Sequence, residues 1–230
     1  MVYMFKQVFS LFTAISEGRF LYLLISLLLY LGLSPFLVDY FGLRLAKDIL
    51  LTAILIAAAV AVGRSKSYTL ISAALALVML ATLWYAYLFP TKGRLLVSAF
   101  LALFFLGLVS AAILTFVFSA REVTRHVIFA AISVYLLFGI VWSIIYLILE
   151  TLAPGSFAVL VDSPLDVTSY LTYFSFVTLT TVGYGDITPI SLKAKAFANL
   201  EGLIGQIYMT VLIAWLVGLY VSRKYSARSK

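Results

Sequence analysis

The sequence contains seven long stretches that carry almost no charge, and they constrain the fold more than any other feature. A membrane core about 30 Å thick is crossed by ~20 apolar residues of α-helix. Most of the stretches are long enough for this. The shortest, 49–63, has lysine and arginine residues near its ends, whose long side chains can reach the membrane surface. The seven stretches cover residues 20–38, 49–63, 67–91, 95–120, 127–149, 167–185 and 196–222, the last interrupted only by Glu201. The sequence therefore predicts an all-α membrane protein.

Composition excludes several classes of function. The chain is 64% hydrophobic and 11% charged, which is far too apolar for a soluble domain. It has no cysteine and a single histidine, His126, so disulfides, thiolate metal sites and multi-histidine metal sites are ruled out. No phosphate-binding loop or nucleophile motif is present. We expect no enzyme activity, no cofactor and no nucleic-acid partner, and we interpret the net charge of +7 as a topology signal.

The charges also indicate how the chain crosses the membrane. The stretch 167–185 is rich in serine and threonine and ends in Gly183-Tyr184-Gly185, a poor composition for a lipid-facing helix. If it re-enters instead of crossing, six spans remain, and one side carries ten basic and two acidic residues against six and six on the other. The positive-inside rule then puts both termini in the cytoplasm of a cell-membrane protein. A crossing would place the basic tail outside, so a re-entrant segment is favoured.

The re-entrant stretch ends in Thr180-Thr181-Val182-Gly183-Tyr184-Gly185-Asp186. A dehydrated cation needs rings of backbone carbonyls, and turning successive carbonyls the same way requires a partly left-handed backbone that glycine tolerates. This heptapeptide resembles the selectivity filter of the potassium channel family. The resemblance implies that Thr181, Val182, Gly183, Tyr184 and Gly185 form the filter. K⁺ would bind there to the carbonyls of Thr181 to Tyr184 and to the Thr181 hydroxyl, supported by Thr180 and Asp186.

The resemblance also implies a pore helix over about Thr168 to Leu179, whose C-terminal end favours a cation. Tyr173 and Phe174 fall where the family places aromatic residues behind the filter, although two ordinary buried aromatics explain them almost equally well. Some relatives have an acidic residue in the pore helix behind the filter aspartate. Val177 occupies that position here, which leaves the partner of Asp186 open.

The flanking stretches match the outer helix (127–149) and inner helix (196–222) of the family's pore. Gly202 and Gly205 lie close together in the inner helix, and they indicate either a gating hinge or close packing against the pore helix. Four residues on one face are candidates for the cavity lining: Gln206, Met209, Ile213 and Val217.

Glu201 is the only acidic residue inside an expected span, and a buried carboxylate in a membrane requires a partner. We expect it to reach a pore-helix hydroxyl such as Ser175 or Thr178. It would then support the filter as a protonated or hydrogen-bonded acid, or join helices without affecting conduction.

One filter copy cannot enclose an ion, so the resemblance implies a homotetramer. We expect a membrane-surface segment (1–19), a four-helix sensor-like domain (20–120) and a pore domain (121–230). Because residues 95–120 contain no arginine or lysine, strong voltage gating is not expected. The predicted function is passive, K⁺-selective conduction within membrane lipid. The alternatives are a weakly selective cation channel and a non-conducting regulatory subunit.

Overall fold

The computed structural model describes residues 18–33, 36, 44–62, 66–89, 91–160 and 166–228. Within these ranges the chain is mostly helical. It forms a helical segment Gly18–Leu33, α2 (Arg44–Val62), α3 (Lys66–Leu88), α4 (Lys92–Phe118), α5 (Arg125–Leu152), α6 (Val167–Leu179) and α7 (Leu192–Arg228). Two short strands, β1 (Phe157–Val159) and β2 (Ile187–Pro189), flank α6. Of the expected membrane-surface segment 1–19, residues 1–17 lie outside the described ranges.

Each expected span coincides with a helix, but the helices differ in length. Among the fully described residues, three helices are long and apolar enough to cross a membrane: Lys92–Phe118, Arg125–Leu152 and Leu192–Ser222. The fully described apolar parts of the first helical segment, α2 and α3 are Gly18–Leu33, Ile49–Ala61 and Ser72–Tyr85, while α2 and α3 themselves have 19 and 23 residues. The 13 residues of α6 extend only about 20 Å, well short of a membrane core. The structure is thus that of an all-α membrane protein with a short helix before its last long one.

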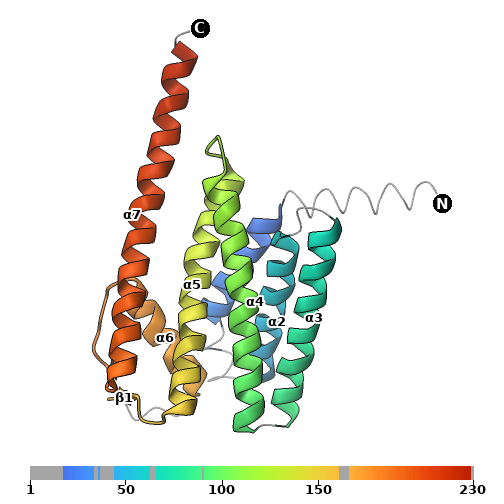
Figure 1. Ribbon diagram of the computed structural model, residues 1–230, viewed down its shortest axis with the longest axis vertical. Helices are drawn as coiled ribbons and strands as arrows, with labels where there is room; N and C mark the ends of the chain where they lie inside the picture. Colours follow the sequence, from blue (N-terminus) through green and yellow to red (C-terminus); the bar gives the residue numbers. More distant parts are fainter. Residues whose placement is uncertain are drawn as a thin grey trace, which may run out of the picture.

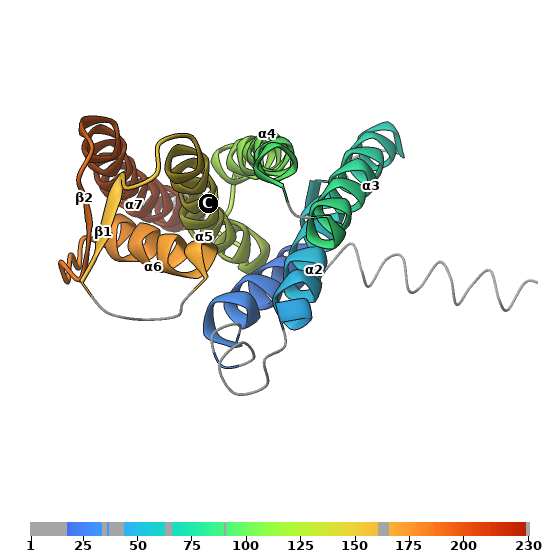
Figure 2. The ribbon, with the colours of Figure 1, turned by 90° about the horizontal axis from the view of Figure 1, so that it is seen from below.

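The helices form two groups, α2 and α3 on one side and α5, α6 and α7 on the other, with α4 between them. Figure 1 shows α2 to α5 side by side, with α6 held between α5 and α7 near the end opposite the C-terminus. Seen from below, α5, α6, α7 and the strands lie on one side of α4 and the helices α2 and α3 on the other (Figure 2). The residues of the expected pore domain, 121–230, therefore gather on one side of the molecule.

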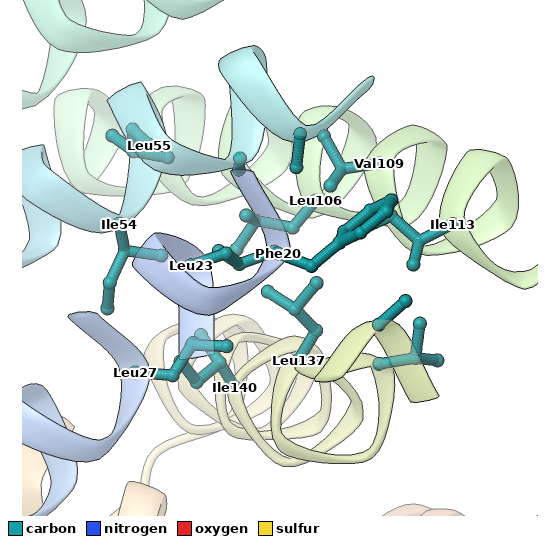
Figure 3. Close-up of a cluster of buried hydrophobic side chains, with 14 of the residues drawn as sticks. Phe20, Leu23, Leu27, Ile54, Leu55, Leu106, Val109, Ile113, Leu137 and Ile140 are labelled. Carbon is teal, nitrogen blue, oxygen red and sulfur yellow. The ribbon is translucent and has the colours of Figure 1, made fainter. Parts of the chain in front are cut away.

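A continuous apolar core joins these two groups. Phe20, Leu23 and Leu27 of the first helical segment are buried against α2, α4 and α5 (Figure 3). The core extends from α5 to Tyr208 and Leu212 of α7. The described residues of 18–118 consequently pack on α5 of the same chain.

Hydrogen bonds link the segment that precedes α6 to the segment that follows it. Strands β1 and β2 pair antiparallel, with Phe157 opposite Pro189 and Val159 opposite Ile187. The Glu150 carboxylate accepts hydrogen bonds from the backbone N–H groups of Gly155 (2.8 Å) and Ser156 (3.0 Å) beyond the end of α5. The Ser156 carbonyl accepts from the N–H of Ile190 at 2.8 Å. The end of α5 is thereby anchored to the start of α7, with α6 and its loop between them.

Candidate functional site

The loop after α6 begins where that helix ends, as the expected pore helix over Thr168 to Leu179 requires. The last carbonyls of α6 accept hydrogen bonds from the loop's own N–H groups. Val182 N–H donates to the Val177 carbonyl and Thr181 N–H to the Thr178 carbonyl, both at 3.0 Å. The Thr180 N–H donates to the Phe176 carbonyl at 3.0 Å. The end of the helix thus holds the start of the loop by its backbone.

Alternate residues of the loop adopt left-handed backbone. The φ angles are 60° at Thr181, 58° at Gly183 and 80° at Gly185, and no other non-glycine residue in the described ranges has a positive φ. The sequence predicted this conformation at the two glycines, which tolerate it. Thr181 was not predicted, because a β-branched residue in this region is strained, of order 1–3 kcal/mol. Such strain in a native fold is typical of a functional site.

The carbonyl groups of this loop are left without backbone partners. Within the described residues, no backbone N–H donates to the carbonyls of Thr181, Val182, Gly183 or Tyr184. The side chains of Val182 and Tyr184 are also exposed, at 52% and 71%. Four successive free carbonyls are costly in an apolar environment unless water, an ion or another chain satisfies them.

Of the two expected supporting aromatics, Tyr173 faces the loop. Its ring lies parallel to that of Tyr184, with 6.5 Å between centroids and 3° between planes, and its hydroxyl group interacts with the Asp186 carboxylate. Phe174 lies in an aromatic cluster with Tyr146 and Phe157, at centroid distances of 5.1 and 5.2 Å. Neighbouring residues of a helix point about 100° apart, which separates the two roles.

A pocket of about 210 Å³ lies behind the loop. Tyr173, Phe174 and Val177 line it from α6, while Gly183, Gly185 and Asp186 line it from the loop. Val177 therefore stands in the pocket with Asp186, and its side chain offers no hydrogen bond. Within the described residues, Oδ1 of Asp186 accepts a hydrogen bond from the N–H of Ile187 at 3.1 Å, and the Tyr173 hydroxyl lies near the carboxylate.

Glu201 is fully buried where α5, α6 and α7 meet. The Ser175 hydroxyl lies 2.5 Å from Oε1, so the predicted contact with the pore helix is confirmed for Ser175. The Tyr146 hydroxyl lies 2.5 Å from Oε2, a partner that the sequence analysis did not identify. Tyr146 was one of several aromatic residues in the stretch 127–149, and only its position opposite Glu201 distinguishes it.

Glycines mark where the helices approach α6 most closely. A Cβ atom on Gly205 would lie 2.8 Å from both the carbonyl oxygen and Cδ1 of Leu179, so close packing accounts for this glycine. Gly202 has nothing within 4 Å of its Cβ position, and α7 continues unbroken through both residues. Gly139 of α5, the only glycine in the stretch 127–149, leaves room for the Phe176 ring and was missed by sequence reasoning.

Helix α7, the expected inner helix, has a narrow buried face and a wide exposed one. Glu201, Gly205, Tyr208 and Leu212 are buried against the same chain. The four candidate lining residues all lie on the exposed part of the helix: Gln206, Met209, Ile213 and Val217. They are accessible from outside the chain, as a cavity-lining role demands.

Comparison with known proteins identifies the part of the chain that contains this site. Residues 132–221, from α5 to α7, match a family model described as "Ion channel". This match supports the assignment of residues 132–221 to an ion channel family. Ion channels of this family are transporters and not enzymes, in agreement with the expectation from the sequence.

A relative adds a weaker and shorter similarity. A 45-residue segment is 44% identical to the two-pore potassium channel 2 of Arabidopsis thaliana. The segment covers 20% of this chain and 10% of that protein, so the likeness concerns a small part of both. No solved structure matches the chain.

Proposed function

We propose that this protein conducts K⁺ selectively and passively through a homotetrameric pore, with the loop Thr181–Gly185 as its filter. The observation that carries this proposal is the run of four unpartnered carbonyls on a backbone that alternates between left-handed and ordinary φ. Oxygens presented in this way replace the hydration shell of a cation. The C-terminal end of α6, beside the loop, adds partial negative charge.

The tetramer follows from the single loop in each chain. One strand of carbonyls cannot surround an ion, whereas four copies around one axis supply closed rings. The exposed side chains of Val182 and Tyr184, and the wide exposed face of α7, are the surfaces that assembly would cover. In this arrangement Gln206, Met209, Ile213 and Val217 line the cavity below the filter.

We propose six membrane spans with both termini in the cytoplasm, since this topology puts the excess of Lys and Arg inside. Within α4, basic residues occur only in the first turn, at Lys92 and Arg94. Charges deep in the membrane field would be needed for strong voltage gating. The four-helix unit is accordingly proposed to support the pore without sensing voltage.

The test is ion flux into liposomes that contain the purified protein, with K⁺ and Na⁺ compared and barium as a blocker. Gly183→Ala and Gly185→Ala should abolish selective flux and leave assembly intact, because a Cβ at these φ angles costs roughly 1–2 kcal/mol per residue. Gly107→Ala is the matched control, since its added Cβ meets nothing within 4 Å. Unchanged K⁺ selectivity in both filter variants would refute the carbonyl mechanism. Equal Na⁺ flux in the native protein would favour a weakly selective channel. Absence of flux would indicate either a closed pore or a regulatory subunit.

A further inference from the structure

Glu201, Tyr146, Ser175 and the Gly139 carbonyl form a buried cluster. The oxygen–oxygen distances within it indicate which atoms carry the protons. The Ser175 hydroxyl is 2.5 Å from Glu201 Oε1 and also 2.7 Å from the carbonyl oxygen of Gly139. Each of these short oxygen–oxygen contacts requires a proton between the two atoms. Ser175 supplies only one, and a backbone carbonyl can only accept. The second proton must therefore belong to Glu201.

With that proton in place, every group in the cluster is satisfied. Tyr146 O–H donates to Oε2 of Glu201. Ser175 is placed to donate to both Glu201 Oε1 and the Gly139 carbonyl; with its single proton given to Gly139, the contact with Oε1 is made by a proton on Glu201. The alternative, an ionised Glu201 that accepts from both hydroxyls, leaves the Ser175 and Gly139 oxygens 2.7 Å apart without a proton between them. It also leaves a fully buried charge that forms no ion pair within the described residues. An isolated charge of this kind inside a membrane protein is strongly disfavoured.

The cluster also lies next to the residues that hold the loop. Ser175 immediately precedes Phe176, Val177 and Thr178, whose carbonyls accept hydrogen bonds from the N–H groups of Thr180 to Val182. Phe176 packs over Gly139, the residue whose carbonyl accepts from Ser175. The position of α6 relative to α5 and α7 thus depends on the same few atoms that set the start of the filter.

We propose that Glu201 is a neutral carboxylic acid that acts as a positioning residue for the filter, through the chain Tyr146, Glu201, Ser175 and the Gly139 carbonyl. It fixes α6 between the outer and inner helices and so holds the left-handed Thr181 in place. The effect on conduction depends on the function proposed above, whereas the neutral state and the fixing of α6 do not.

Glutamine distinguishes the neutral acid from a carboxylate. In Glu201→Gln the amide oxygen accepts from Tyr146 and the amide N–H donates to Ser175, which repeats the pattern of the neutral acid. Flux and selectivity of this variant should stay within about twofold of the native protein. Glu201→Ala should lose about tenfold or more, because the buried Tyr146 hydroxyl loses its acceptor and the Ser175 oxygen loses the donor that ties it to α7. Ser175→Ala should resemble it. The control Ser143→Ala removes another buried hydroxyl, which bonds within α5 at 2.7 Å to the Ile140 carbonyl, and should change little.

Infrared spectroscopy tests the proton directly. The native protein should show the carbonyl band of a protonated carboxyl group, and Glu201→Gln should lose it. Absence of the band, or a Glu201→Gln variant as impaired as Glu201→Ala, would overturn the proposal. Should the native protein carry no K⁺ flux, the proposed function fails. The infrared band and the thermal midpoints of the variants would then still decide between a neutral acid and a carboxylate.

Discussion

The approach of α7 to the end of α6 gives the sharpest test of how this molecule is built. Replacing Gly205 by alanine adds a Cβ only 2.8 Å from the carbonyl oxygen of Leu179, a backbone atom that cannot rotate away. Either α7 or the last turn of α6 must move. Because Leu179 lies two residues before Thr181, the displacement should reach the proposed filter as well as the helix contact.

A matched variant at Gly202 separates the free-energy cost of the close contact at Gly205 from the effect of helix propensity. Gly202→Ala introduces the same group into the same helix, but nothing lies within 4 Å of its Cβ. Both changes gain about 1 kcal/mol because alanine favours helix over glycine. That gain cancels in the comparison, which leaves the cost of overpacking, about 1–3 kcal/mol. For a chain of 230 residues this corresponds to a difference of roughly 2–12 °C in thermal midpoint.

The assay is thermal unfolding of the two purified variants in the same detergent, followed by circular dichroism, with K⁺ and Na⁺ flux measured in parallel. Gly202→Ala should be at least as stable as the native protein and fully active. Gly205→Ala should unfold at lower temperature and lose selectivity. If the two variants melt together, α7 does not approach Leu179 as described. If Gly202→Ala alone loses conduction, Gly202 is a hinge and packing at Gly205 is not the deciding contact.

Two further changes test the contacts that hold β1 against α5 and α6. Phe174→Ala should destabilise the protein by about 3–5 kcal/mol, because the buried ring contacts Tyr146 and Phe157. Thermal unfolding measures this loss. The control Phe104→Ala, at a ring that is 59% exposed, should destabilise the protein far less. Glu150→Ala removes an acceptor for two backbone N–H groups and should cost about 1–3 kcal/mol. A Glu150→Ala protein that unfolds like the native one would show that these hydrogen bonds do not hold β1 in place.

Local chemistry accounts for what the sequence predicted correctly. The positions of the helices follow from the lengths of the uncharged stretches, because a helix is the simplest way to satisfy the backbone in lipid. The left-handed φ angles at Gly183 and Gly185 follow from the residue type itself. The contact between Glu201 and Ser175 followed from the need of a buried acid for a nearby hydroxyl group.

Contacts between distant helices account for what was missed. Tyr146 is 55 residues from Glu201, and which residue of α5 faces α7 depends on the rotation of both helices. That rotation is set by packing, with Gly139 fitted against Phe176. The roles of Tyr173 and Phe174 were treated together, although adjacent residues of a helix cannot face the same neighbour. The helical period alone would have separated them.

The strained Thr181 connects these contacts. A β-branched residue with φ at 60° persists only where its surroundings over-determine the backbone. Here α6 is held by the Phe176 ring over Gly139, by Leu179 against Gly205, and by the hydrogen bonds of Ser175. Its last carbonyls then hold the N–H groups of Thr181 and Val182. Loosening any one of the three contacts should therefore let Thr181 relax first. If the loop is the filter proposed above, ion selectivity should fail before the helices separate.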